Sequence, residues 1–138
     1  ISSSPDVATK IHGLTPLGVE QVNASAEDFC KGQGPGQVMI VTSDFTRARM
    51  TAEIFAEHLG CAAPTNEVRL RERFFGSLDG GPDDQYHNVW AFDKDNADHS
   101  EFGAESVNSV IKRTTARVAE LDKKYEGTKE TICMSNSL

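Results

Sequence analysis

The chain has 138 residues, of which 38% are hydrophobic and 25% are charged, as expected of one ordinary globular domain. Its formal net charge of −7 argues against the broad basic surface that binds nucleic acid or anionic membranes. No apolar stretch in the sequence approaches the roughly 20 residues that a membrane-spanning helix requires.

The three cysteines, Cys30, Cys61 and Cys133, are far apart and odd in number. Their spacing matches neither a metal site nor a disulfide framework, so we expect three thiols in a reducing compartment. The opening stretch ISSSPDVATK contains no apolar signal core. These two features predict a cytoplasmic protein.

The first helix is predicted to follow a polar, loop-like stretch at residues 1–13. Thr15 and Pro16 are typical of an N-cap followed by the first helical position, and Gly32 marks the end of the helix. Four residues would share one face of this helix: Leu14, Val22, Ala26 and Phe29. The following GQGPG stretch predicts a loop.

The middle of the chain contains a continuous apolar run, Val38–Thr42, which predicts a central parallel strand buried on both faces. Residues 46–59 read as a helix that stops at Gly60. The NEVRL stretch at 66–70 predicts a weaker strand, and residues 86–92 predict a short helix. We expect residues 77–103 to form a variable insertion that acts as a lid.

The longest helix is predicted from about residue 106 to residue 125, followed by a buried strand at 131–134. Its inward stripe would consist of Val107, Val110, Ile111, Thr114, Val118, Leu121 and Tyr125. Strands that alternate with helices predict an α/β fold, a three-layer sandwich with a mainly parallel sheet flanked by helices.

Arg47 would lie in the first turn of a helix, at the carboxyl edge of the sheet. Ligands of such sheets bind at this edge, where an anion also gains from free backbone N–H groups. A simpler alternative is that Arg47 and Arg49 are solvated helix residues that pair with Glu53 or another carboxylate.

The stretch LRERFFGSLDGG, residues 70–81, places a glutamate between two arginines and ahead of a glycine. A carboxylate near guanidinium groups can donate or accept a proton if its pKa suits the task. Arg-Glu-Arg is also a common surface pattern, so this stretch alone leaves both interpretations open.

Four stretches in this order resemble the histidine phosphatase superfamily, in its phosphoglycerate mutase-like group. They are LTPLGVEQV, VTSDFTRARMTAEIF, LRERFFGSLDG and GAESVNSVIKRT. The most specific elements are Leu-Thr-x-x-Gly and Ser-x-x-x-Arg-Ala-x-x-Thr-Ala, and the resemblance runs from about Leu14 to the last strand. It implies a phosphoglycerate mutase-like fold over a single domain, residues 1–138.

The resemblance implies a two-step phosphoryl transfer through a phosphohistidine, with no metal and no cofactor. Arg47 matches the arginine that clamps the transferred phosphoryl group, because a planar guanidinium suits phosphate oxygens. Glu72 matches the carboxylate that acts as general acid for the leaving group. Arg49 falls at a variable position and is expected to be structural.

Other positions carry implied roles around the substrate. Arg73, Phe74 and Phe75 lie where the family lines its substrate pocket. Glu105 and Ser106 match a pair at a helix start, which we interpret as a capping device that also supports the site.

The sequence departs from the family at its two catalytic histidines. It has no Arg-His-Gly motif behind a first strand, and His12 in KIHG follows a polar stretch instead of an apolar strand. Asn136 in TICMSNSL stands where the second histidine is expected, and it could donate a hydrogen bond to phosphate. We expect His58, His87 and His99 to be surface residues.

Two hypotheses follow from these departures. In the first, the 138 residues are a domain incomplete at both ends, and the protein is a phosphatase of small phosphorylated metabolites. In the second, the chain is a catalytically dead domain that binds phosphate or a protein partner. A mutase-type phosphotransferase is the other alternative, but Phe74 and Phe75 replace the His-Tyr pair expected of mutases. The expected ligand is a small phosphorylated substrate or inorganic phosphate. The oligomeric state stays open, with a dimer among the options.

Overall fold

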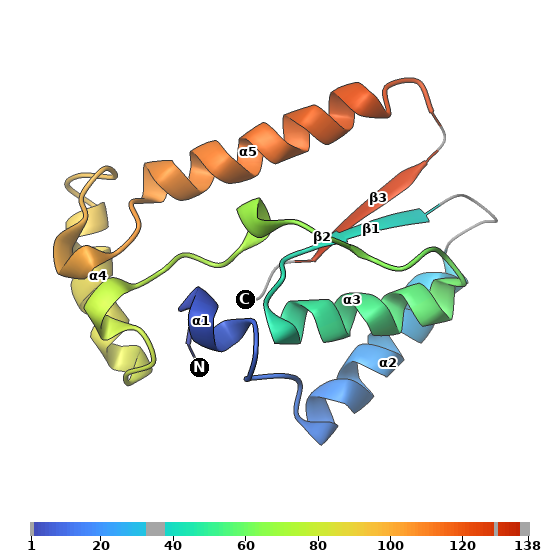
Figure 1. Cartoon of the computed structure of the whole chain (residues 1–138), viewed down its shortest axis with the longest axis horizontal. Coiled ribbons are helices and arrows are strands. Elements are labelled where there is room, and N and C mark those ends of the chain that lie inside the picture. Colours follow the sequence, from blue (N-terminus) through green and yellow to red (C-terminus); the bar gives the residue numbers. More distant parts are fainter. Residues whose placement is uncertain (1, 33–37, 129, 136–138) are drawn as a thin grey trace.

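The computed structural model describes residues 2–32, 38–128 and 130–135. Its sheet contains three parallel strands: β1 (Val38–Thr42), β2 (Thr65–Asn66) and β3 (Thr131–Ser135). The order is β2-β1-β3, so β1 occupies the centre as its apolar run predicts. β1 pairs with β3 along its whole length, from Val38 opposite Thr131 to Thr42 opposite Ser135 (Figure 1).

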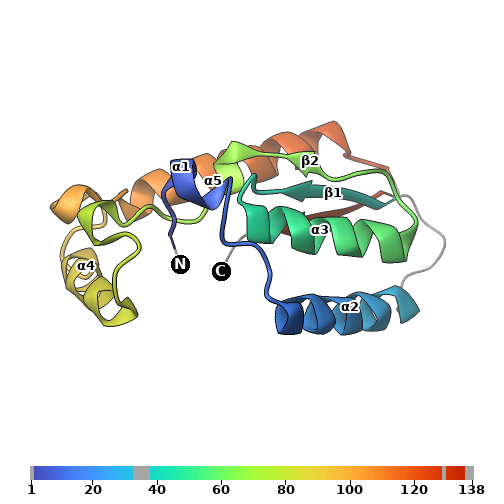
Figure 2. The same ribbon diagram turned by 60° about the horizontal axis from the view of Figure 1, so that its bottom comes forward.

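Helices cover both faces of the sheet, which confirms the predicted sandwich. Figure 2 shows α3 (Thr46–Leu59) below the sheet and α5 (Val107–Lys124) above it, with α2 (Pro16–Lys31) beyond α3. Two shorter helices, α1 (Pro5–Ala8) and α4 (Tyr86–Asp93), lie to the side. In the described part of the chain, no helix combines the length and apolar character needed to cross a membrane.

The predicted helix boundaries are confirmed by their caps. The Thr15 hydroxyl accepts a hydrogen bond from the Gly18 N–H at the start of α2. Ser106 does the same for the Ser109 N–H at the start of α5. Gly60 ends α3 in the left-handed region, with φ of 62°. These boundaries therefore follow from local chemistry that the sequence already displays.

The core divides into one cluster on each face of β1. Ile40 packs with Ala52 and Ala56 of α3, whereas Val41 packs with Leu70 and with Leu121 of α5. Successive residues of a strand point to opposite faces, so one apolar run supplies both clusters. The two layers hold the carboxyl end of β1 in a fixed position.

The predicted strand at 66–70 was largely wrong. Only Thr65 and Asn66 pair with β1, and Val68–Leu70 forms a 3₁₀ helix, η1. The Glu67 N–H donates to the Thr42 carbonyl oxygen at 2.7 Å, and the Glu67 carboxylate then caps η1 by accepting from the Arg69 N–H. A side-chain cap thus turns the chain out of the sheet after two residues.

Two further expectations need correction. The 1–13 stretch contains the short helix α1, which starts at Pro5. The inward stripe of α5 was partly wrong, since Ile111 is 51% exposed and Val118 is 43% exposed. Arg113 instead points inward, because its guanidinium binds three backbone carbonyl groups of the neighbouring segment.

Residues 77–103 leave the sheet and form α4 with three 3₁₀ turns, η2 (Gly76–Leu78), η3 (Asp83–Gln85) and η4 (Glu101–Gly103). A small core of Phe75, Val89 and Ala104 holds this region together. The predicted helix at 86–92 is confirmed by α4. A lid function for this segment stays a prediction.

Candidate functional site

Arg47 and Glu72 form an ion pair at the carboxyl end of β1. Arg47 lies in the first turn of α3, and its Nη2 donates to Oε2 of Glu72. The two side chains are 11% and 29% exposed. Burial raises the pKa of Glu72, although the Arg47 guanidinium opposes that rise. The structure therefore brings together the two residues that the sequence assigns to catalysis.

Arg49, unlike Arg47, is the solvated helix arginine of the simpler alternative and pairs with Glu53. Its Nε lies 3.7 Å from Oε1 of Glu53, one helical turn away, and both side chains are largely exposed. Such a pair contributes little to stability. The two arginines have different surroundings because residues two positions apart on a helix point to different sides of it.

The short helix α1 lies near the start of α3 (Figures 1 and 2), and the segment before α1 contacts Arg47. The carbonyl oxygen of Ser2 accepts a hydrogen bond from Nη1 of Arg47 at 3.4 Å. Ser2 and Ser3 are buried, and both hydroxyls donate to the carboxylate of Asp79. Arg47 is thus held on one side by Glu72 and on another by the backbone of Ser2.

A second arginine follows in the same edge region. Arg71 donates from Nε and Nη2 to the two oxygens of Asp44, at 2.7 and 2.6 Å. These hydrogen bonds lower the pKa of Asp44, more than partial burial raises it. The guanidinium carbons of Arg47 and Arg71 lie 5.4 and 5.8 Å from the ring centre of the buried Phe45. Both cations therefore lie within reach of the Phe45 ring.

Arg73, predicted to bind substrate, is bonded within the protein. Its Nη1 and Nη2 donate to Asp93 at 2.7 and 2.9 Å, and its Nε donates to the Glu105 carbonyl oxygen at 2.7 Å. Asp93 also contacts Nε2 of His99 at 2.7 Å. Arg73 thereby ties the 77–103 region to the start of α5. A direct substrate contact for Arg73 stays a prediction.

The two phenylalanines behind Arg73 occupy different environments. Phe74 lines a pocket of about 290 Å³ together with Ser3, Phe45, Arg71, Glu72 and Arg113. Phe75 is 8% exposed and stacks on Tyr86 with ring centres 4.2 Å apart. Phe74 thus lines a pocket, and a substrate contact for it stays a prediction. The same prediction for Phe75 is untested, and its observed role is packing.

A larger cavity of about 590 Å³ lies elsewhere, beside residues 38–41 of β1 and the carboxyl end of α5. Its described lining includes Met39, Cys61 and Tyr125. The predicted site residues are absent from this lining. We take the smaller pocket as the candidate site because Glu72 and Phe74 line it; Arg47 is not among its described lining residues but binds Glu72, which is.

Glu105 and Ser106 support the site from the start of α5. Ser106 is the N-cap of α5. Glu105 accepts from Nε and Nη2 of Arg113 at 2.8 and 2.9 Å. Arg113 in turn donates to the carbonyl oxygens of Arg69, Arg71 and Glu72, so this pair fixes the backbone that carries Glu72. Both predictions for the start of α5, a cap and a supporting contact, fit these bonds.

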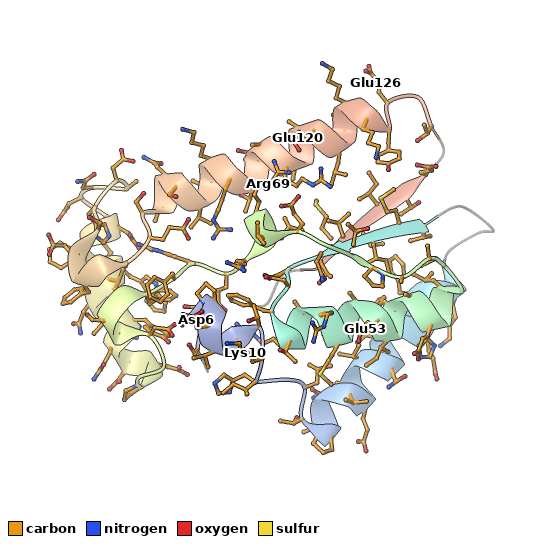
Figure 3. All side chains as sticks on the ribbon, viewed as in Figure 1. Asp6, Lys10, Glu53, Arg69, Glu120 and Glu126 are labelled. Atoms are coloured by element: carbon orange, nitrogen blue, oxygen red, sulfur yellow. The ribbon has the colours of Figure 1, made fainter. Side chains whose placement is uncertain are left out.

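Further ion pairs tie η1 to α5. Arg69 donates to both carboxylate oxygens of Glu120, at 2.7 and 2.9 Å, and Figure 3 shows the two side chains meeting between these elements. Arg69 also binds the cap residue Glu67. The segment that leads into the site is therefore anchored at both η1 and Arg113.

The four histidines are described, and none forms a hydrogen bond or ion pair with Arg47 or Glu72 among the described residues. His12 is exposed with φ of 61°, His58 contacts Asn23, and His87 packs against Trp90. His99 was wrongly expected at the surface. It is 7% exposed because Asp93 and the Glu101 N–H satisfy both ring nitrogens. Asn136 lies outside the described residues.

Sequence reasoning missed Asp44, Asp79 and Arg113. Arg113 carried a signal, since it falls on the same α5 face as Val110 and Leu121, where an apolar residue is expected. Asp44 lies two residues after the end of a buried strand, at the edge where such sheets bind ligands. Asp79 gave no signal, because its partners lie at least 75 positions away in the chain.

Comparison with solved structures supports the fold. Mycobacterial glucosyl-3-phosphoglycerate phosphatase is 27% identical, with a TM-score of 0.72 over 90% of this chain and 61% of that phosphatase. Its complex with inorganic phosphate gives 28% identity and a TM-score of 0.73, over 90% and 63%. The alpha-ribazole phosphatase from Shigella flexneri, at 18% identity and a TM-score of 0.68 over 89% and 61%, shares the fold.

The chain spans about three fifths of the length of these solved structures. No curated protein sequence matches it significantly. The sequence profile of the histidine phosphatase superfamily (branch 1) matches residues 6–137, which is nearly the whole chain. With the order of the motifs and the parallel sheet, this match shows that the chain belongs to the histidine phosphatase superfamily.

Proposed function

We propose that this domain provides the phosphate clamp and the general acid of a phosphatase that acts on small phosphorylated metabolites. The observation that carries the proposal is the pairing of Arg47 with Glu72 at the carboxyl edge of the sheet. The reaction would proceed through a phosphohistidine, with the nucleophile supplied from outside these 138 residues. A cytoplasmic location stays a prediction from the sequence.

Arg47 would hold the phosphoryl group. Its guanidinium is 11% exposed and fixed by Glu72 and by the Ser2 carbonyl oxygen, so little side-chain freedom remains to be lost on binding. A positioned guanidinium stabilises the charge that develops on phosphate oxygens in the transition state. The 27% identical relative is itself a phosphatase, and one of its structures contains inorganic phosphate.

Glu72 would protonate the leaving oxygen. A general acid needs a pKa near the working pH, and burial raises the pKa of Glu72 in that direction. Arriving phosphate would compete with the Glu72 carboxylate for Arg47, which favours the protonated form of Glu72 in the complex. The ion pair between Arg47 and Glu72 would thus couple substrate binding to protonation of Glu72.

The alternative function is phosphate binding without turnover. It is supported by the positions of the four histidines, each of which is exposed or bonded away from Arg47. A phosphatase is preferred to a mutase because Phe74 and Phe75 offer no titratable group beside Glu72. The identity of the phosphorylated metabolite stays open, whereas glucosyl-3-phosphoglycerate is the substrate in the name of the relative.

The test of the clamp is anion binding by the 138-residue chain, measured by calorimetry with inorganic phosphate. Arg47→Ala should weaken binding by at least about tenfold, since charge-assisted hydrogen bonds are lost. Arg49→Ala is the matched control, with the same charge change on the same helix, and should alter affinity less than about twofold. Equal affinities for the two variants would remove Arg47 from the site.

The acid can be tested by binding as well as by turnover. Sulfate keeps its charge in mildly acidic solution, so its affinity for the wild type should rise as pH falls through the Glu72 pKa. Glu72→Gln should abolish that dependence, because no competing carboxylate then remains. In turnover, Glu72→Gln should slow the hydrolysis of esters with poor leaving groups and leave the hydrolysis of p-nitrophenyl phosphate nearly unchanged. An equal loss on both esters would contradict the general-acid role.

A further inference from the structure

One carboxylate, that of Asp79, binds three successive residues of a segment at least 75 positions away in the chain. It accepts from the hydroxyls of Ser2 and Ser3, from the Ser3 N–H at 2.6 Å and from the Ser4 N–H at 3.1 Å. Together these four donors use both oxygens of Asp79. A carboxylate with this many donors is a strong anchor.

The anchored segment is buried as a result. Ser2 is 7% exposed and Ser3 is 5% exposed, which polar side chains tolerate only when they are hydrogen-bonded. The Ser4 N–H also contacts the Ser2 hydroxyl at 3.0 Å, which closes a compact turn before α1. Without an acceptor at Asp79, two buried hydroxyls and the Ser3 N–H would lose this partner, and the Ser4 N–H would keep only the Ser2 hydroxyl.

This turn contacts the predicted phosphate clamp directly. The Ser2 carbonyl oxygen accepts from Nη1 of Arg47, while Nη2 of Arg47 binds Glu72. Ser3 also lines the 290 Å³ pocket that contains Glu72 and Phe74. The path from Asp79 to Arg47 therefore runs through one short turn, residues 2–4.

The negative charge of Asp79 cannot itself attract phosphate. A carboxylate near Glu72 repels an incoming phosphate, and it also helps to raise the pKa of Glu72. Hydrogen bonds from Ser2 and Ser3 lower the pKa of Asp79 despite its partial burial, so the carboxylate stays charged at neutral pH. A negative charge beside an anion site is reasonable only if its structural effect outweighs its repulsion.

We propose that Asp79 is a positioning residue, which holds residues 2–4 against Arg47 and so keeps the guanidinium oriented for a phosphoryl group. The inference rests on the proposed function of Arg47. It assigns to the loop after η2 a role in anion binding that does not involve contact with the anion. Through Ser3 this turn lines the pocket that contains Glu72, and through the Ser2 carbonyl oxygen it contacts Arg47.

The test uses the sign of the change in phosphate affinity. If Asp79 acts only through its charge, Asp79→Asn should tighten phosphate binding because a repulsive charge is removed. If Asp79 positions the turn, the same variant should weaken binding by about tenfold, because ordering the turn then opposes binding. Asp79→Glu keeps the acceptor and should recover part of the affinity. The exposed Asp83→Asn is the control for charge alone.

A second measurement follows the turn itself, through hydrogen exchange of the Ser3 and Ser4 amides without phosphate. Asp79→Asn should accelerate both by at least about tenfold, and Asp83→Asn should leave them unchanged. Amides that keep their wild-type protection would overturn the inference, as would tighter or unchanged phosphate binding in Asp79→Asn. A wild type that binds no phosphate would instead overturn the function proposed for Arg47, and amide exchange alone would then decide the role of Asp79.

Discussion

The two halves of the site are built by different means. Arg47 and Asp44 follow β1 and are carried by a strand and a helix whose apolar residues form two core clusters. Glu72 and Asp79 lie in a segment with no regular element longer than a 3₁₀ turn until α4. In that segment, bonds between arginine and carboxylate or carbonyl groups replace the sheet.

The difference shows where positional precision comes from. A parallel strand fixes its successor through a ladder of backbone hydrogen bonds and packing on both faces. The Glu72 segment has one small apolar cluster, so Arg73 and Arg113 cross-link it to α4 and α5. The strand-borne half should tolerate conservative surface changes, whereas the loop-borne half should respond to the loss of single polar side chains.

The largest effect is expected from Gly76→Ala. Gly76 has φ of 63°, and a Cβ there would lie 2.1 Å from the Phe102 carbonyl oxygen and 2.5 Å from the Gly103 carbonyl carbon. Strain and overlap should together cost about 2–5 kcal/mol in the free energy of unfolding, measured in urea. Gly80→Ala is the matched control, with φ of 76° and nothing within 4 Å, and should cost about 1 kcal/mol. Equal losses would show that η2 and η4 are not in close contact.

Arg113→Met should have the second largest effect on the free energy of unfolding. The variant keeps much of the side-chain volume but removes the donor to three carbonyl groups and leaves the Glu105 carboxylate with the Ser109 hydroxyl and without its guanidinium partner. We expect a loss of about 2–4 kcal/mol in the free energy of unfolding. The exposed Lys112→Met provides a control on the same helix. A loss confined to the Arg113 variant would support the view that this side chain fixes the Glu72 segment.

A pH-dependent prediction concerns Asp93. Hydrogen bonds from Arg73 lower the pKa of Asp93, more than partial burial raises it. A lowered folded-state pKa stabilises the fold above the unfolded-state pKa, and this contribution is lost as pH falls through the folded-state value. Asp93→Asn should therefore cost about 1–2 kcal/mol at neutral pH and progressively less in acid.

The exposed Asp95→Asn should show no such pH dependence, and thermal melts across the acidic range would compare the two variants. A constant difference between wild type and Asp93→Asn from neutral to strongly acidic pH would contradict the assignment.

The smallest effect should come from the strand-borne half. Arg49→Ala removes an exposed pair with Glu53 at 3.7 Å and should change the free energy of unfolding by less than about 0.5 kcal/mol. Glu53→Gln should behave alike in the same urea series. A larger loss in either variant would mean that the start of α3 depends on surface charge as the Glu72 segment does.

The regular framework of helices and strands follows from local features of the sequence. Pro16, Gly60 and Ser106 mark helix ends through local hydrogen bonds or backbone preference, and the apolar run of β1 predicts a central strand. The order of the motifs also placed Arg47 and Glu72 in one family pattern. These features depend on neighbours within a few residues, so the linear order displays them.

The hydrogen bonds between polar side chains, in contrast, depend on the tertiary structure. Asp79 binds a turn more than 70 positions away, and Arg113 takes an inward position that periodicity assigns to an apolar residue. His99 is buried because Asp93 accepts from it across a loop. Residues 68–70 lie outside the sheet because the Glu67 side chain caps the 3₁₀ helix η1. The contacts of Asp79 with residues 2–4 and of Arg113 with backbone carbonyl groups join residues at least 41 positions apart in the chain, whereas those of His99 and Glu67 are local side-chain bonds that outweigh the propensity of their stretch.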